Sequence, residues 1–207
     1  MNELILKIEN LNLAAGGHEL FKNFNLAVSP KEIIGFFAPT GSGKTTLFNY
    51  IADHAHPEQN AVPELVEGLP VSYVFQEPRL IPSQTVLKNV TLPLENKMDK
   101  AAANATATTW LEKLNMLHKI NDSAKTLSGG EQQRTAIARA FAHLEAGGLL
   151  LLDEPFAAQD ENNIQNIITL IKQLIVQKSC SCLVICHDRT LLEQLCSKII
   201  TKDMFIS

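Results

Sequence analysis

Nine residues, 38–46, combine two glycines with a lysine and three threonines in the sequence APTGSGKTT. This spacing fits a phosphate-binding loop between a strand and a helix, whose backbone N–H groups surround the phosphates of a nucleotide. In such a loop we expect Lys44 to reach the β- and γ-phosphates and Thr45 to bind Mg²⁺. Ala38 replaces the first glycine of the strict pattern, but Gly41 and Gly43 remain where the backbone must approach the phosphates closely.

A second anion-binding sequence, LSGGEQQR, occupies residues 127–134 and contains no lysine. A serine and two glycines at the start of a helix present backbone N–H groups at its positive end. An apolar stripe through Ala136, Ile137 and Phe141 predicts that this helix covers residues 130–146. The sequence therefore predicts two phosphate-directed segments, of which only the first is complete.

Two carboxylates, Asp153 and Glu154, follow a run of four leucines, and His187 follows a second apolar run, CLVIC. Runs of this kind are typical of parallel strands that are covered on both faces, and ligands bind at their carboxyl ends. We expect Asp153 to hold Mg²⁺ and Glu154 to act as a general base toward water. The alternative is that both carboxylates only cap the next helix.

The remaining pattern predicts the elements that position these residues. Residues 4–13 and 19–28 are expected to form an antiparallel β element, and residues 31–38 and 71–75 are expected to form buried strands. Residues 99–120 are expected to form one long helix with Trp110 on its apolar face. The predicted fold class is α/β, with a P-loop NTPase core, a mostly parallel sheet, an N-terminal antiparallel β element and a small α-helical subdomain.

Composition limits the classes of function. The chain has 207 residues, 45% of them apolar and 19% charged, and a net charge of -4, which predicts one domain and disfavours nucleic acid as a partner. No apolar run approaches the roughly 18 residues that span a bilayer, and the start does not resemble a signal peptide. Cys180, Cys182 and Cys186 are interpreted as reduced thiols rather than zinc ligands, and His54 and His56 as part of a solvated loop.

In these motifs the chain resembles an ATP-binding cassette (ABC) ATPase over nearly its whole length. Six segments stand in the order of that family: APTGSGKTT as Walker A, Gln76 as Q-loop, LSGGEQQR as signature, LLLLDEP as Walker B, AAQD as D-loop and CHD as H-loop. The resemblance implies a single ABC ATPase domain, 1–207, with a helical subdomain at about 78–135 inserted in it.

The resemblance also implies the roles of individual residues. Glu154, His187 and Gln76 are implied as catalytic residues, and Thr45, Gln76 and Asp153 as the residues around Mg²⁺. Ser128, Gly129 and Gly130 are implied to contact ATP bound to a second subunit, and Asp160 to bridge the two subunits. The implied nucleotide contacts within one chain are Pro39, Thr40, Gly41, Ser42, Gly43, Lys44, Thr45 and Thr46.

Two segments depart from the family pattern. Ala14 and Ala15 stand where the family has an aromatic residue that stacks on adenine. The alternatives are stacking on His18 or Phe21, or a weakly held base and a relaxed preference for ATP over GTP. The D-loop reads Ala-Ala-Gln-Asp instead of the usual Ser-Ala-Leu-Asp, so it keeps Asp160 and lacks the serine hydroxyl.

The segment FQEPRLIPSQTVLKNVTLPLE is similar to ATPase subunits of nitrate, sulfonate and taurine importers, which use this region to touch their membrane partner. The resemblance implies an ATPase on the cytoplasmic face of the cell membrane that energises import. The implied partners are a second copy or a paralogous subunit, integral membrane permease subunits and an extracytoplasmic binding protein, with no nucleic acid. The alternatives are a soluble ABC-type ATPase acting on DNA or the ribosome, and a nucleotide-binding scaffold with little turnover.

Overall fold

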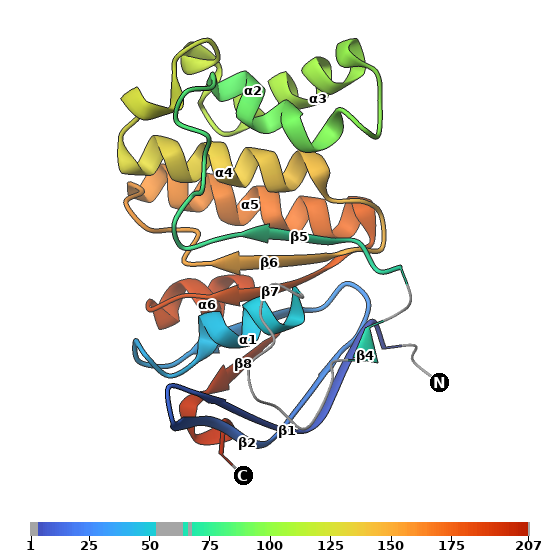
Figure 1. Ribbon diagram of the computed structural model, residues 1–207, viewed down its shortest axis with the longest axis vertical. Helices are drawn as coiled ribbons and strands as arrows, with labels where there is room; N and C mark the ends of the chain where they lie inside the picture. Colours follow the sequence, from blue (N-terminus) through green and yellow to red (C-terminus); the bar gives the residue numbers. More distant parts are fainter. Residues whose placement is uncertain (1–3, 53–63, 66–67, 207) are drawn as a thin grey trace.

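A computed structural model describes residues 4–52, 64–65 and 68–206 of the chain. His54 and His56, which the sequence assigns to a solvated loop, lie outside these residues. The central sheet has five parallel strands in the order β5-β6-β7-β3-β8 (Figure 1). Its strands are β3 (Ile33–Phe37), β5 (Val71–Val74), β6 (Leu149–Asp153), β7 (Ser181–Ile185) and β8 (Lys198–Thr201). The predicted parallel sheet is therefore confirmed.

Packing on both faces of the sheet explains its leucine-rich strands. Every residue of β6 is buried, and alternate leucines enter two different hydrophobic clusters. Leu150 and Leu152 face the cluster formed by the larger helices, whereas Leu149 and Leu151 face the cluster under α1 and the N-terminal strands. A strand with solvent on one face would alternate apolar and polar residues instead.

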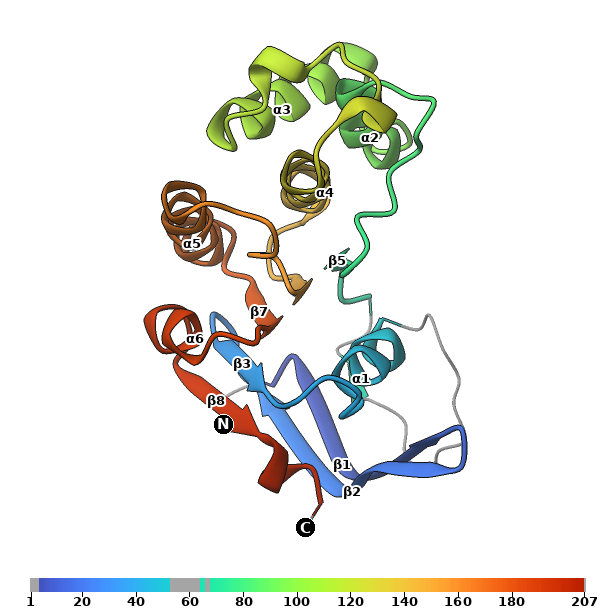
Figure 2. The same cartoon turned by 90° about the vertical axis from the view of Figure 1, so that its left-hand side faces the viewer.

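An antiparallel sheet covers one side of the molecule, as predicted. β1 (Leu6–Ala15) pairs with β2 (His18–Val28), and the two-residue β4 (Glu64–Leu65) pairs with the other edge of β1. Gly16 and Gly17 both have positive φ, 58° and 77°, which is what the tight turn of a two-residue hairpin requires. α1 (Lys44–Ile51) lies between this hairpin and the parallel sheet (Figure 2).

Three helices cover the opposite face of the parallel sheet: α4 (Gly129–His143), α5 (Glu161–Lys178) and α6 (Arg189–Leu195). α2 (Val86–Thr91) and α3 (Lys100–Lys113) form a further layer outside α4 (Figure 2). Trp110 of α3 is 9% exposed and packs edge-to-face against Phe141 of α4, which confirms its predicted place in the core. The short 3₁₀-helices are η1 (Leu92–Leu94), η2 (Leu117–Lys119), η3 (Ala124–Thr126) and η4 (Lys202–Met204).

The prediction of one helix over residues 99–120 was wrong at its carboxyl end. α3 stops at Lys113 because Asn115 adopts the left-handed conformation, with φ 57°. The N–H of the buried Met116 then donates to the carbonyl of Leu111 at 2.7 Å, which closes the helix end. Asparagine tolerates this conformation, but helical periodicity alone does not reveal it.

α4 also ends earlier than predicted, at His143 rather than 146, because Leu144 has extended backbone angles. The predicted limit of the helical subdomain, residue 135, falls inside this continuous helix. α4 packs against α2 and α3 on one side and reaches β5 on the other. The division of the chain into a core and a helical subdomain at about 78–135 stays a prediction.

Candidate functional site

Two glycines of the loop between β3 and α1 adopt left-handed backbone conformations. Gly41 has φ 78°, and Gly43, the residue before α1, has φ 95°. A Cβ atom on Gly43 would lie 2.9 Å from Cβ of Leu20 and 3.0 Å from Cε2 of Phe21. Only glycine adopts this positive φ without strain and also leaves room for the neighbouring side chains. The loop therefore packs tightly against β2.

Lys44 is only 6% exposed, although its side chain carries a positive charge. Its Nζ donates to the carbonyls of Ala38 at 2.6 Å and Pro39 at 2.9 Å, so loop backbone oxygens hold the ammonium. Burial lowers the pKa of Lys44, and the carboxylates of Glu154 and Asp153 oppose that shift. The side chain is thus fixed inside the loop beside two acidic groups.

A hydrogen bond across the site connects Thr45 of α1 to Asp153 at the end of β6. Thr45 Oγ1 donates to Asp153 Oδ2 at 2.7 Å, and Asp153 is 1% exposed. Burial raises the pKa of Asp153, while the hydrogen bond from Thr45 and the charge of Lys44 lower it. A hydroxyl and a carboxylate oxygen placed together in this way are the kind of ligands that Mg²⁺ takes.

Glu154, the next residue, has a left-handed backbone, with φ 51°, and its side chain faces a different neighbour from that of Asp153. Its Oε1 lies 3.2 Å from Nε2 of His187, and the same nitrogen lies 3.4 Å from Oγ1 of Thr40. Burial raises the pKa of Glu154 to about 7, and the nearby charge of Asp153 adds to the rise. A carboxylate with a pKa near neutrality is suited to accept a proton from water.

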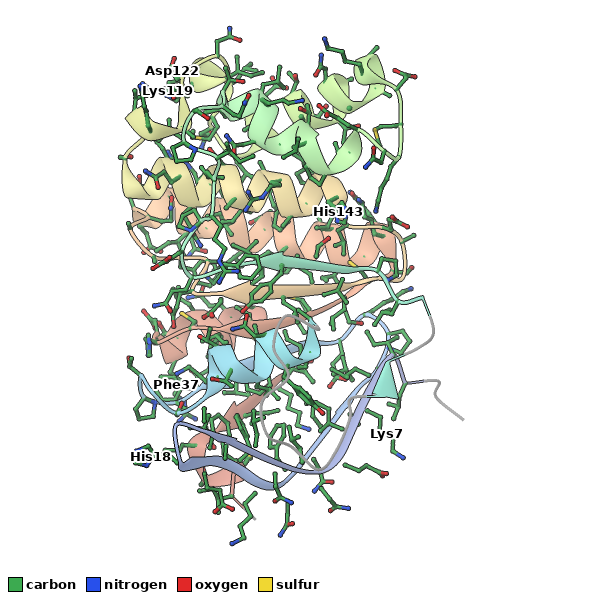
Figure 3. All side chains as sticks on the ribbon, viewed as in Figure 1. Lys7, His18, Phe37, Lys119, Asp122 and His143 are labelled. Carbon is green, nitrogen blue, oxygen red and sulfur yellow. The ribbon has the colours of Figure 1, made fainter. Side chains whose placement is uncertain are left out.

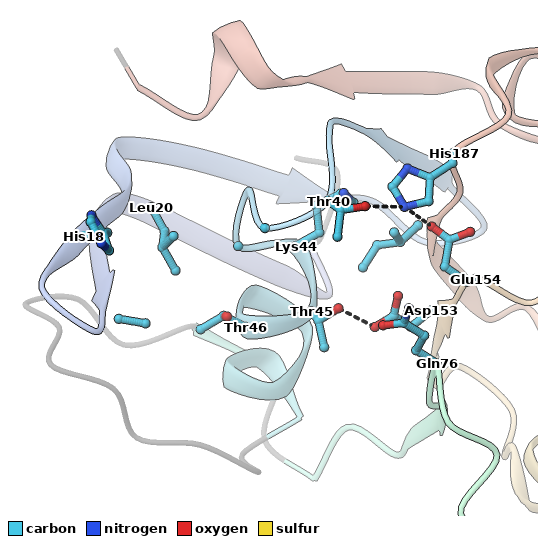
Figure 4. A pocket seen from close by; sticks show the side chains of 14 residues that line it. His18, Leu20, Thr40, Lys44, Thr45, Thr46, Gln76, Asp153, Glu154 and His187 are labelled. Carbon is cyan, nitrogen blue, oxygen red and sulfur yellow. Dashed lines mark hydrogen bonds and ion pairs between the residues drawn. The ribbon is translucent and has the colours of Figure 1, made fainter.

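These side chains surround one open pocket of about 380 Å³ (Figure 4). The pocket lies at the carboxyl ends of the parallel strands, where ligands bind in α/β folds. Of the residues that the sequence singles out, the pocket is lined by Thr40, Gly41, Gly43, Lys44, Thr45, Thr46, Gln76, Asp153, Glu154 and His187. Pro39 and Ser42 belong to the same loop.

One end of the pocket is formed by the β1–β2 hairpin, where the sequence lacks an aromatic residue. Ala15, His18 and Leu20 line this end, and His18 stands beside the hairpin turn (Figure 3). The alternative that Phe21 stacks on a base is wrong. Phe21 is fully buried and packs against the rings of Phe24 and Phe205, at centroid distances of 5.0 and 4.6 Å.

The LSGGEQQR segment does not line this pocket. Ser128 is exposed and caps α4: its hydroxyl donates to Glu131 Oε2 at 2.9 Å and accepts from the Glu131 N–H at 3.4 Å. This capping box, and above all the backbone N–H of Ser128, lowers the pKa of Glu131. A Cβ on Gly129 would meet nothing closer than Cβ of Ala158 at 4.0 Å, so its glycine is not required by its own chain. Asp160 is also exposed and lies outside the pocket.

The cysteines that suggest a metal site are part of the core. Cys180, Cys182 and Cys186 are buried as free thiols, and burial raises the pKa of each of them. Across the described ranges, no group of three or more His, Cys, Asp or Glu side chains is arranged to hold a metal ion. The predicted burial of Cys182 and Cys186 among apolar neighbours is confirmed.

Four residues in or beside the site had no role assigned from the sequence: Leu20 and Ile185 of the pocket, Gln133 of the signature segment and Gln159 of the D-loop. Leu20 and Ile185 line the pocket as ordinary strand residues. Gln133 is 3% exposed, and its Nε2 donates to the carbonyl of Glu154 at 3.4 Å. Its place in the polar start of α4 gives no sign of this burial, because the partner is a backbone group distant in the sequence.

A phosphate-binding loop after β3, a buried aspartate at the end of β6, two strands away in the sheet, and the parallel sheet itself together define a P-loop nucleotide-binding fold. The family model for ABC transporters matches residues 21–157. The chain belongs to this family, and it is an ATP-binding and ATP-hydrolysing transporter subunit. No helix in the described part of the chain has both the length and the apolar character needed to span a membrane.

Relatives and solved structures agree with this assignment. The chain is 31% identical to the probable ABC transporter ATP-binding protein PEB1C of Campylobacter jejuni, over 95% of this chain and 86% of that protein. It is 34% identical to the aliphatic sulfonates import ATP-binding protein SsuB 2 of Paracoccus denitrificans, over 87% of this chain and 70% of that protein. A dimeric post-hydrolysis structure of the ATP-binding cassette MJ0796, bound to ADP and Pi, superposes with a TM-score of 0.85 at 28% identity, covering 97% and 95% of the two chains. These relatives favour a self-associating transporter subunit over an ATPase acting on DNA or the ribosome, or a scaffold.

Proposed function

We propose that two copies of this chain, or this chain and a paralogous subunit, enclose two ATP molecules and drive solute import through separate permease subunits. The observation that supports this proposal is that the groups expected to bind phosphate lie in two separate parts of the molecule. The pocket at Lys44 contains a lysine, Thr45 and two carboxylates, whereas Ser128 and Gly129 are exposed and contribute nothing to it. Each half becomes useful when a second copy brings its signature segment to the first copy's pocket.

Within one copy, the loop residues from Pro39 to Thr46 would hold the triphosphate with their N–H groups, and Lys44 would turn from the loop carbonyls to the β- and γ-phosphates. Thr45, Asp153 and Gln76 fit a Mg²⁺ ion, because all three are oxygen donors that line one pocket. The ion would neutralise charge on the β- and γ-phosphate oxygens when bound.

Glu154 is the proposed general base for the attacking water. Its side chain contacts His187 rather than the Thr45–Asp153 pair, and its pKa of about 7 leaves a substantial deprotonated fraction at neutral pH. His187 would contact the γ-phosphate from the position where it now contacts Glu154 and Thr40. These residues act by positioning and electrostatics, which is how most phosphoryl-transfer enzymes work.

Across the dimer, Ser128 and the N–H groups of Gly129 and Gly130 would address the γ-phosphate held by the other copy. The first turn of α4 supplies the positive end of its helix there. Asp160 caps α5 by accepting from the Asn163 N–H at 2.9 Å, and it is exposed, as a residue that bridges two subunits must be.

The proposed membrane-facing surface lies where the chain leaves Gln76. A pocket of about 340 Å³ is formed there by residues of the 77–82 segment together with Ala124, Lys125 and Gln132. Arg139 of α4 holds the segment in place by donating to the carbonyls of Pro78 at 2.7 Å and Arg79 at 2.9 Å. This surface would place the chain on the cytoplasmic face of the cell membrane, with an extracytoplasmic binding protein completing the system. Relatives whose names include import support the direction of transport.

Affinity purification of the tagged chain from detergent-solubilised membranes of its host tests this function. We expect an integral membrane protein to be recovered, and Ile81→Asp, an exposed residue of the 77–82 segment, to lose it. The matched control is Val176→Asp, which changes an exposed apolar residue near the end of α5. Recovery of ribosomes or nucleic acid alone, or equal recovery by both variants, would contradict the proposal.

A further inference from the structure

The loop that carries the proposed base, residues 154–160, needs support from outside itself. Glu154 and Ala158 both have left-handed backbones, with φ 51° and 56°, which residues with a side chain adopt at a cost. Such a conformation persists only when neighbouring groups fix it. In this chain those groups come from the first two turns of α4, the helix that begins with the signature glycines.

Gln159 makes the central contact between the loop and the helix. Its Nε2 donates to the carbonyl of Gly130 at 3.0 Å, and its Oε1 accepts from Nη1 of Arg134 at 2.7 Å. One side chain therefore satisfies a backbone acceptor at the helix start and a guanidinium donor one turn later. The primary amide supplies the donor and the acceptor that these two contacts require.

The backbones on the two sides of this contact are also fitted closely. A Cβ on Gly130 would lie 2.4 Å from the carbonyl oxygen of Ala158, so no larger residue fits without moving the loop. Gln133 adds a contact at the other end of the loop, to the carbonyl of Glu154 at 3.4 Å. The loop and the helix start are thus joined at Glu154, Ala158 and Gln159.

We propose that Gln159 is a positioning residue that makes the 154–160 loop and the signature segment move as one unit, and thereby couples the two ATP sites of the dimer. The inference rests on the proposed function, in which Glu154 acts on ATP in its own chain and Gly129 on ATP in the partner. A rigid link between these two segments carries a change at one site to the other. The leucine usual at this place in the D-loop would make neither hydrogen bond.

Two variants, Gln159→Leu and Gln159→Glu, distinguish a positioning role of Gln159 from a contribution to folding stability alone. Leucine removes both hydrogen bonds, whereas glutamate keeps the contact with Arg134 as an ion pair and sets a carboxylate oxygen against the carbonyl of Gly130. We expect both variants to lose about tenfold in kcat with little change in KM for ATP, and to reduce the Hill coefficient for ATP toward 1. Gln159→Glu should keep the wild-type Tm, and Gln173→Leu, an exposed residue of α5, should behave as wild type.

Hydrogen–deuterium exchange of the nucleotide-free protein provides a reading that does not require turnover. Both Gln159 variants should exchange faster in two separate stretches, 156–160 and 130–134, with the phosphate-binding loop unchanged. Faster exchange in only one stretch, or a wild-type Hill coefficient and kcat in Gln159→Leu, would overturn the inference. Linked faster exchange in both Gln159 variants, together with a wild-type protein that hydrolyses no ATP, would instead contradict the proposed function.

Discussion

Two helix starts in this molecule are predicted to bind phosphate, and they differ in how many of the groups around them come from their own chain. At α1, Gly43 is pressed against Leu20 and Phe21, and Lys44 is buried beside it. At α4, Gly129 has open space around it, and the only charged group in the first turn is the acidic Glu131. Under the proposed function, a glycine that its own chain does not require is explained by a ligand that a second copy brings. The comparison therefore contrasts a pocket completed within one chain with a helix start that we propose to act on the partner's nucleotide.

The largest effect should come from the carboxylate at the first site. Glu154→Gln keeps the size of the side chain but cannot accept a proton, so we expect turnover to fall about 1,000-fold while ATP still binds and holds a dimer together. Steady-state ATPase assays and size-exclusion chromatography with Mg-ATP measure both effects. Glu112→Gln, on the exposed face of α3, is the control, and equal turnover in Glu154→Gln would refute its role as base.

Lys44→Ala should break the first site at the binding step. Loss of the buried ammonium removes charge-assisted hydrogen bonds to the phosphates, so ATP affinity should fall about 300-fold. Isothermal titration calorimetry of the variant, with the exposed Lys172→Ala as control, provides the measurement. Undiminished affinity in Lys44→Ala would show that this loop does not hold the triphosphate.

Gly129→Leu should break the second site and leave the first intact. The space at Gly129 accepts a side chain within one copy, but that side chain would block the γ-phosphate of the partner, so turnover should fall about 100-fold with unchanged ATP binding and Tm. Gly130→Ala is the contrasting variant, because its Cβ would strike the carbonyl of Ala158 and should lower Tm as well. Loss of ATP binding in Gly129→Leu would place the signature at its own chain's nucleotide.

Ala15→Tyr should strengthen ATP binding at the first site by adding an aromatic ring that can stack on adenine. Ala15 lines the pocket at the end of β1, and a ring there can stack on adenine, which should raise ATP affinity about tenfold. The neighbouring Ala14→Tyr, on the opposite face of the strand, is the matched control. Competition between ATP and GTP measures the base preference; equal affinities in Ala15→Tyr and wild type would mean that the base does not approach this strand.

Motifs with local causes could be predicted well. The phosphate-binding loop, the leucine-rich strand before Asp153 and the hairpin at Gly16 each depend on neighbouring residues, and the structure has them as predicted. Predictions failed where a distant contact or a single backbone angle decides. Asn115 ends α3, and Phe21 turns into the core against Phe205 rather than toward the pocket. Neither outcome has a periodic signal in the sequence.

The sequence by itself determined which chemical groups this protein has and where each phosphate-directed loop begins, because glycine spacing and buried strands are local properties. Only the tertiary structure decided which of them meet. It placed Thr45 next to Asp153 and His187 next to Glu154, although the residues of the first pair are far apart in the sequence. Hydrophobic packing of the parallel sheet brings these residues together. The tertiary structure also kept Ser128 out of that pocket and joined Gln159 to Gly130. Distances between residues far apart in the chain are set by the packed core as a whole, so no single segment encodes them.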